Sequence, residues 1–327
     1  MKELNQFENY LVHEFVEDYE DGIMSRRDMV RRVLHITGGV AATATVLSRL
    51  GVAAAAQDGT PPPQPTPTGP RSSVAVPADD PRIMAEEITF EGDDATIMAY
   101  QAMPAEGAEM ASPASSPAAT PVGSGGLPLV LICHENRGLT DHIRDVTRRW
   151  AAQGYVACAV DLLSREGGTA NVADPAEIPA ILTDTDPMRH VADFQAAIAH
   201  YETEAFADTS RLGMTGFCFG GGITWRAATQ IAELNAAAPY YGPPPPVEDV
   251  PNIQAAVLGV YSDDPNDFAN EGLPELEAAL EASGATFQIN IYPGTQHAFH
   301  NDTGARWNEE QALAAWNDTL AWFAQYI

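Results

Sequence analysis

Short apolar runs alternate with amphipathic segments through most of this chain of 327 residues. Apolar residues that recur on one face of a helix predict helices, and continuous short apolar runs predict strands covered on both faces. The predicted strands span residues 88–91, 95–103, 127–133, 155–160, 211–215, 234–241, 253–261 and 286–292. The predicted helices span residues 141–153, 186–201, 273–282 and 309–326.

This order of elements predicts an α/β fold. The first two strands are joined by a tight Gly-Asp-Asp turn at residues 92–94, which is typical of an antiparallel pair. The later strands alternate with helices, which favours a mainly parallel central sheet with helices on both faces. We therefore expect one domain over residues 83–327. The low-complexity residues 105–126 are predicted to be a surface loop inserted between two strands.

The amino-terminal segment has a different character. Residues 25–30 read Ser-Arg-Arg-Asp-Met-Val, a twin-arginine pattern, and a weakly apolar stretch follows to Ala56. An Ala-x-Ala cleavage site precedes Gln57. We expect residues 1–56 to be a twin-arginine-type signal, read by the export machinery, that places the protein in the periplasm or outside the cell. The alternative is a cytosolic protein with an amphipathic amino-terminal helix.

Residues 57–82 are rich in Pro and Thr, a composition that predicts an extended, disordered linker. The formal net charge of the chain is −28, and no cluster of basic residues interleaved with aromatics occurs in it. Such a chain repels phosphate backbones, which excludes nucleic-acid binding. The three cysteines do not form a C-x-x-C motif or a His/Cys cluster at zinc spacing, so we expect neither a metal nor a cofactor.

One cysteine stands in a turn that predicts catalysis. Residues 216–221 read Gly-Phe-Cys-Phe-Gly-Gly, after a predicted strand and before a helical pattern that begins near Ile223. Strand, tight turn and helix form the context of a nucleophile elbow, in which the nucleophile here is Cys218. A thiol on such a turn, at a helix amino terminus, ionises more easily than a hydroxyl. The alternative is a glycine-rich turn with an inert cysteine.

A base and an orienting acid should follow later strands, in the order nucleophile, acid, histidine. His297 lies on the loop after the last predicted strand. Residues 262–267, Ser-Asp-Asp-Pro-Asn-Asp, follow the strand before it. An acid in that stretch could hold the Nδ1–H of His297 and fix its tautomer. The carboxyl ends of parallel strands meet at one edge of a sheet, so these groups are expected to lie together.

These segments resemble the dienelactone hydrolase (carboxymethylenebutenolidase) family of α/β-hydrolases, from about Ile88 to Ile327. The elbow and the loop 292–299 carry the resemblance. Two further segments match: residues 134–139, His-Glu-Asn-Arg-Gly-Leu, and the Gly-Tyr to Asp-Leu strand at residues 154–162.

The resemblance implies an α/β-hydrolase fold and hydrolysis of a small ester or lactone through an acyl-enzyme, without a cofactor. It implies a triad of Cys218, His297 and an aspartate. We assign the aspartate to Asp264, with Asp263 and Asp267 as alternatives.

The resemblance further implies that Glu135 contacts the resting thiol and helps to activate it. The backbone N–H groups of Asn136 and Phe219 would form the oxyanion hole.

The chain departs from the family where the family's carboxylate-binding Arg follows the histidine, because Ala298 and Asn301 stand there. Arg137, Arg189 or Arg306 could take its place. The alternatives to a dienelactone-like hydrolase are a promiscuous carboxylesterase and a hydrolase-fold binding module without turnover.

Overall fold

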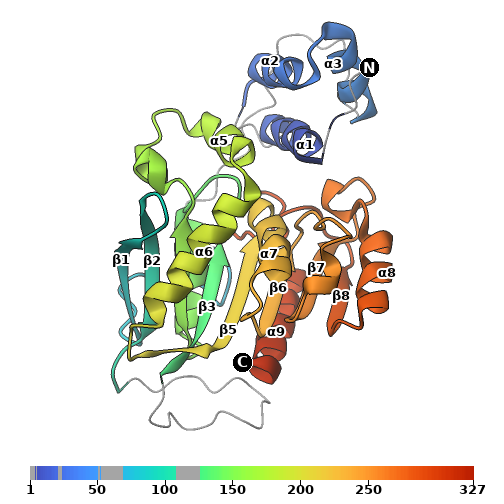
Figure 1. Cartoon of the computed structure of the whole chain (residues 1–327). Helices are drawn as coiled ribbons and strands as arrows, with labels where there is room; N and C mark the ends of the chain where they lie inside the picture. The colour runs from blue at the N-terminus through green and yellow to red at the C-terminus, as the bar shows by residue number, and fades with distance from the viewer. Residues whose placement is uncertain (1–3, 5, 21–23, 51, 53–68, 108–125) are drawn as a thin grey trace.

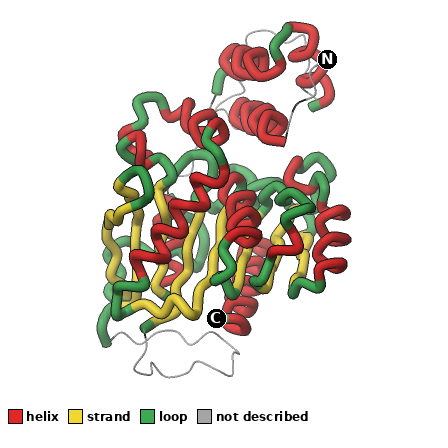
Figure 2. Tube along the Cα trace, viewed as in Figure 1, coloured by secondary structure: helices red, strands yellow, loops and turns green. Residues whose placement is uncertain are grey.

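The computed structural model describes residues 4, 6–20, 24–50, 52, 69–107 and 126–327. Within these residues one eight-stranded sheet has the order β1-β2-β4-β3-β5-β6-β7-β8 (Figures 1 and 2). The strands are β1 (Ile83–Glu91), β2 (Thr96–Pro104), β3 (Leu127–Cys133), β4 (Val156–Asp161), β5 (Ala207–Phe217), β6 (Ala236–Tyr240), β7 (Ala256–Ser262) and β8 (Phe287–Tyr292). The helices are α1 (Gln6–Glu20), α2 (Arg26–Thr37), α3 (Val40–Arg49), α4 (Asp141–Ala151), α5 (Ile178–Asp184), α6 (Pro187–Tyr201), α7 (Phe219–Gln230), α8 (Leu273–Ser283) and α9 (Glu309–Tyr326).

The sheet is parallel from β4 to β8, and the β1–β2 hairpin adds to β4 in antiparallel fashion. Helices α6 and α7 cover one face, and α9 lies behind the other (Figure 1). Trp150 of α4 packs edge-on against Trp316 of α9, with ring centroids 5.0 Å apart, so these two helices share that second face. The predicted mainly parallel sheet with helices on both faces is confirmed.

The central strands are buried on both faces, as their continuous apolar sequences require. In β3, residues Leu129 to Cys133 are fully buried, and every residue of β4 is buried as well. The strand β3 and the helix α9 coincide with the predicted ranges 127–133 and 309–326. Residues 108–125, most of the predicted loop insertion, lie outside the described part of the chain.

Part of the predicted linker packs on the domain instead. The backbone N–H groups of Arg71 and Ser72 donate to the carboxylate of Asp302 at 3.0 and 2.8 Å. The disordered linker expected over residues 57–82 is therefore wrong for residues 69–82, because buried carboxylates of the domain bind the backbone of that segment. Residues 57–68 lie outside the described residues.

The amino-terminal segment forms α1, α2 and α3, which lie beyond the carboxyl ends of the parallel strands (Figure 1). Ser25 caps α2 by accepting from the backbone N–H of Asp28. The apolar face of α1 is buried, with Val12 and Phe15 among its covered residues. Among the described helices, none has both the length and the apolar character needed to cross a membrane. The predicted cleavage site lies outside the described residues.

Candidate active site

Cys218 occupies a sharp turn between β5 and α7, as the sequence predicts. Its backbone has φ 57° and ψ −118°, a conformation that side-chain-bearing residues rarely adopt. Its N–H donates to the carbonyl oxygen of Tyr240 on β6 at 3.0 Å. The turn therefore presents the thiol at the carboxyl edge of the sheet.

The glycines around Cys218 are required by close backbone packing. A Cβ on Gly220 would lie 2.4 Å from the carbonyl oxygen of Cys133, at the end of β3. A Cβ on Gly221 would lie 2.3 Å from the carbonyl oxygen of Tyr240 on the other side. The turn is thus wedged between the strands that flank β5, and only glycine fits where it touches them.

His297 follows β8 and is oriented by a buried carboxylate. Its Nδ1 lies 2.9 Å from Oδ1 of Asp267, and both side chains are almost fully buried. Asp267 also accepts from Ser262 Oγ at 2.6 Å and from the backbone N–H of Ala269 at 3.0 Å. These bonds fix the carboxylate, which in turn fixes the ring and its tautomer.

The structure corrects the choice of aspartate. Asp264 accepts from the backbone N–H of Asn266 at 2.9 Å, within its own turn, and does not reach His297. Asp263 accepts from the backbone N–H of Gly294 at 2.9 Å. Asp267, the third of the aspartates considered, makes the contact with His297. The assignment to Asp264 is wrong because Asp263 and Asp264 cap loops, while the backbone turns the side chain of Asp267 inward.

Asp267 and His297 each stabilise the charged form of the other. Burial alone would lower the pKa of His297, but the charge of Asp267, and that of Cys218 once its thiol is ionised, raise it well above its usual value. Burial likewise opposes ionisation of Asp267, yet His297 and the hydrogen bond from Ser262 hold the pKa of this carboxyl below its usual value. Asp267 can therefore stabilise a positive charge that forms on His297.

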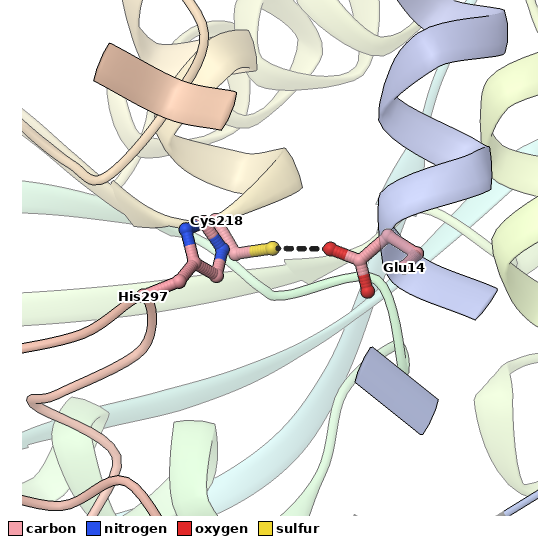
Figure 3. Close-up of side chains that lie close together, drawn as sticks. All are labelled: Glu14, Cys218 and His297. Carbon is pink, nitrogen blue, oxygen red and sulfur yellow. Dashed lines mark hydrogen bonds between the residues drawn. The ribbon is translucent and has the colours of Figure 1, made fainter. Parts of the chain in front are cut away.

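The resting thiol donates to Glu14 of α1, a residue that sequence reasoning did not select. Cys218 Sγ lies 3.2 Å from Glu14 Oε1 (Figure 3). The hydroxyl of Tyr10, one turn earlier on α1, lies 3.5 Å from the same sulfur. The Glu14 carboxylate also accepts from the side-chain amide of Asn136. These contacts place α1 directly over the thiol.

Glu135, the residue predicted to contact the thiol, is bound elsewhere. Its Oε2 accepts from Asn301 Nδ2 at 2.7 Å, and its Oε1 is buried without a hydrogen-bond partner among the described residues. The predicted contact is therefore wrong, since Glu14 occupies that position. Glu14 and Cys218 are 204 residues apart, and the segment with Glu14 was assigned to the signal, so no local pattern pointed to it.

The position of α1 over Cys218 affects the ionisation of the thiol. Burial, and next the charge of Glu14, raise the pKa of Cys218 to about 12. Burial, and next the charge of Glu17, also raise the pKa of Glu14. With α1 in this position the thiol carries its proton at neutral pH, whereas an exposed thiol at a helix amino terminus would ionise more easily.

When its ring is neutral, His297 can take that proton. The donor atoms of Glu14, Cys218 and His297 all lie within 4.8 Å of one another. Because Nδ1 faces Asp267, Nε2 is the ring nitrogen left for the thiol, and it is buried without a hydrogen-bond partner among the described residues. The three side chains are also the described His, Cys, Asp and Glu residues close enough to share a metal ion. Sequence spacing could not show this, because α1 supplies one of them.

The two predicted oxyanion donors, Asn136 and Phe219, lie on different elements. Phe219 is the first residue of α7, so its N–H lies in the turn whose amides have no intrahelical acceptor. Asn136 is buried on the loop that follows β3. The backbone N–H groups of both residues have no hydrogen-bond acceptor among the described residues. Two unused donors thus flank the turn that holds the thiol.

A cavity of about 520 Å³ contains the thiol and His297. Arg137 and Arg306 line it, together with acidic residues of α1. Arg189 of α6, the third arginine considered for substrate binding, donates to Oγ1 of Thr185 at 2.9 Å and does not line this cavity.

Comparisons with known proteins point to one family. The model of the family described as "Dienelactone hydrolase family" matches residues 115–327. A candidate carboxymethylenebutenolidase from Methylorubrum extorquens is 33% identical over 260 residues, which cover 75% of this chain and 82% of the relative. One from Escherichia coli K12 is 32% identical over 254 residues, which cover 74% and 92%. The crystal structure of a candidate dienelactone hydrolase from Klebsiella pneumoniae is 31% identical, with a TM-score of 0.65, and the match covers 75% of this chain and 99% of that chain.

Replacing Asp267 with Asn should lower the pKa of His297, because the negative charge of Asp267 raises that pKa against the effect of burial. An NMR titration of the imidazole resonances would measure the change. Asp264→Asn is the matched control and should leave the pKa unchanged, since Asp264 binds Asn266. Equal shifts in the two variants would contradict the assignment.

Proposed function

Because this chain belongs to the dienelactone hydrolase family of α/β-hydrolases and is therefore an ester-cleaving hydrolase, we propose that it opens a small ester or lactone with Cys218 as the nucleophile. His297 is the general base and acid, and Asp267 orients it. The observation that carries this proposal is the bond from His297 Nδ1 to Asp267, which leaves Nε2 for a thiol on a strand-turn-helix elbow.

In the first half of the reaction, the neutral form of His297 takes the proton of Cys218 Sγ at Nε2 as the sulfur attacks the carbonyl carbon of the substrate. The carbonyl oxygen becomes an oxyanion, and the N–H groups of Phe219 and Asn136 donate to it. The carbon–oxygen ester bond then breaks. The protonated His297 gives its proton to the departing alkoxide, and a thioester to Cys218 remains.

In the second half, the neutral His297 takes a proton from water while the water oxygen attacks the thioester carbonyl. The carbon–sulfur bond breaks, the acid product leaves, and the proton returns to Cys218. Asp267 keeps its own charge throughout and stabilises the imidazolium each time it forms. The low pKa of Asp267 in its network of hydrogen bonds supports this role.

The arginines in the cavity favour a substrate with a negative charge. Arg137 pairs with Asp18 of α1, and Arg306 pairs with Glu17 at 2.8 Å. Two guanidinium groups that already hold carboxylates in the cavity of the nucleophile are suited to hold a substrate carboxylate. We therefore favour a carboxylate-bearing lactone, in keeping with the carboxymethylenebutenolidase names of the relatives, over a neutral ester.

The amino-terminal segment supports export as a further part of the proposal. Its twin-arginine pattern stands at the start of α2, where Arg27 is exposed to solvent. A signal that export machinery recognises has to be accessible. We propose that this twin-arginine segment directs the chain out of the cytoplasm.

Replacing Cys218 with Ala should abolish ester hydrolysis, because no other group can form the thioester. Asp267→Asn should lower kcat by about 10⁴-fold, through loss of the correct tautomer of His297. Hydrolysis of 4-nitrophenyl acetate would be measured in the full chain and in a Glu14→Gln background, which removes the carboxylate from the thiol.

Asp264→Asn is the control and should retain most of the activity, since its carboxyl caps a loop. Thermal unfolding of each variant would show that the fold is intact. Full activity in a folded Cys218→Ala variant would overturn the proposal. A wild-type chain that turns over no ester in either background would favour a binding module instead.

Arg137→Gln should lower kcat/KM for a carboxylate-bearing lactone relative to that for 4-nitrophenyl acetate, by about tenfold, the effect of a lost charged hydrogen bond. Taking the ratio of the two substrates cancels any effect of the variant on α1. Arg189→Gln is the matched control and should leave the ratio unchanged. An unchanged ratio in Arg137→Gln and in Arg306→Gln would favour the promiscuous carboxylesterase.

Replacing both Arg26 and Arg27 with Lys should keep the chain in the cytoplasm, because the export machinery reads the arginine pair. Cell fractionation followed by immunoblotting would measure the distribution. Arg31→Lys, on the same helix but outside the pair, is the control and should be exported like the wild type. Retention of all three proteins in the cytoplasm would contradict the export proposal.

A further inference from the structure

We propose that α1 is an inhibitor built into the chain: it occupies the substrate position beside Cys218, and hydrolysis requires α1 to leave the cavity. This rests on the proposed function, because it concerns access to the same nucleophile. The amino-terminal segment would then act on the enzyme itself, in addition to its proposed role as an export signal.

The position of Glu14 excludes substrate. A carbonyl carbon that is to be attacked must come to within about 3–3.5 Å of the nucleophilic atom. Glu14 Oε1 already lies 3.2 Å from Cys218 Sγ (Figure 3). The hydroxyl of Tyr10 lies 3.5 Å from the same sulfur. Two atoms of α1 thus already lie at the distance from the sulfur that the attacked carbonyl needs, so α1 and the substrate compete for that position.

Two acidic residues of α1 pair with arginines at the rim of the cavity. Glu14, Glu17 and Asp18 are spaced i, i+3 and i+4, so they share one face of the helix. Glu17 pairs with Arg306 at 2.8 Å, and Asp18 pairs with Arg137. Both arginines line the cavity that contains Cys218. The helix therefore places carboxylates where the proposed substrate would place its own, as a substrate mimic does.

Apolar contacts add to the fit. Tyr10 is buried, and its ring lies 6.2 Å from that of Phe219 and 5.3 Å from that of Phe268, measured between centroids. The ring of Phe268 in turn lies 4.7 Å from that of His297. The helix is therefore packed against the residues that wall the triad, besides being held by charges at the rim.

The ion pairs between α1 and the two arginines are partly exposed to solvent. Arg137 and Arg306 keep part of their side-chain surface in solvent, with 29% and 22% of it exposed. Ion pairs of such partly exposed arginines are individually weak, so a change of charge on α1 is enough to break them. Cleavage at the Ala-x-Ala site before Gln57 would remove α1 altogether. Export and removal of the signal would then yield the uninhibited enzyme.

The test reverses the charges of α1 in the full chain. Glu17→Arg combined with Asp18→Arg faces the rim arginines with like charge and should release the helix. The rate of alkylation of Cys218 by iodoacetamide and the kcat/KM for neutral 4-nitrophenyl acetate should then both rise by about tenfold, the effect of losing two ion pairs and gaining repulsion. Glu275→Arg combined with Glu277→Arg on the exposed surface of α8 makes the same change in charge and should alter neither rate.

A charge swap identifies the contact itself. Asp18→Arg alone should speed alkylation of Cys218. Adding Arg137→Asp should slow alkylation again, because the ion pair is restored with the two charges exchanged. Thermal unfolding of each variant would establish that the domain is folded. Restoration by the swap supports docking of α1 at this rim, and failure to restore overturns it.

Alkylation and hydrolysis separate this inference from the proposed function, because alkylation reports access to the thiol whether or not the enzyme turns over an ester. Unchanged alkylation in the folded Glu17→Arg/Asp18→Arg variant would overturn the docking. Faster alkylation with slower hydrolysis of the neutral ester would overturn the inhibition, and would show that Glu14 assists the reaction. Hydrolysis that survives in Cys218→Ala would instead overturn the proposed function and leave the alkylation result standing.

Discussion

The wedging of the turn at Cys218 between β3 and β6 is the constraint on which the site depends. Backbone atoms of both strands touch Gly220 and Gly221, and the N–H of Cys218 donates to Tyr240. The thiol consequently cannot shift without moving the centre of the sheet. The ends of β7 and β8 lie next along the same edge and bring Asp267 and His297 to it. The loop that carries His297 is anchored in turn a few residues later, where buried Asp302 pairs with Arg149 at 2.9 Å.

Sequence reasoning succeeded where structure is local. Periodicity predicted β3 and α9 to the residue, and the glycine pattern around Cys218 predicted the elbow. It chose the wrong aspartate because every acid in residues 262–267 has the chemistry to cap a turn. Only the course of the backbone, which brings Asp267 to the start of a short 3-10 turn, decides which one faces His297. Glu14 could not be predicted, since its position comes from the packing of a helix distant in sequence.

Two arginines stand out in the lining of the cavity. The chain carries a net charge of −28, and most charged residues around the cavity are acidic as well, yet Arg137 and Arg306 also line it. Glu17 and Asp18 of α1 pair with these two arginines, close to a thiol whose pKa is raised by burial and by the charge of Glu14. The same two arginines thus hold α1 and, in the proposed reaction, a substrate carboxylate.

Two other residues near the site share the positive φ angle of Cys218. Among the described residues other than glycine, positive φ angles occur at Cys218, Tyr241 and Ala298, with values of 57°, 36° and 62°. Tyr241 lies against the ring of His297, and Ala298 follows that residue directly. Each such residue costs about 1–3 kcal/mol, so the three together oppose folding by a sizeable part of the 5–15 kcal/mol typical of a domain. The buried sheet must supply that difference. The backbone conformations at the site therefore lower the thermal stability of this protein. Substitutions that raise its stability would have to act elsewhere in the domain, or would relax the site at the expense of catalysis.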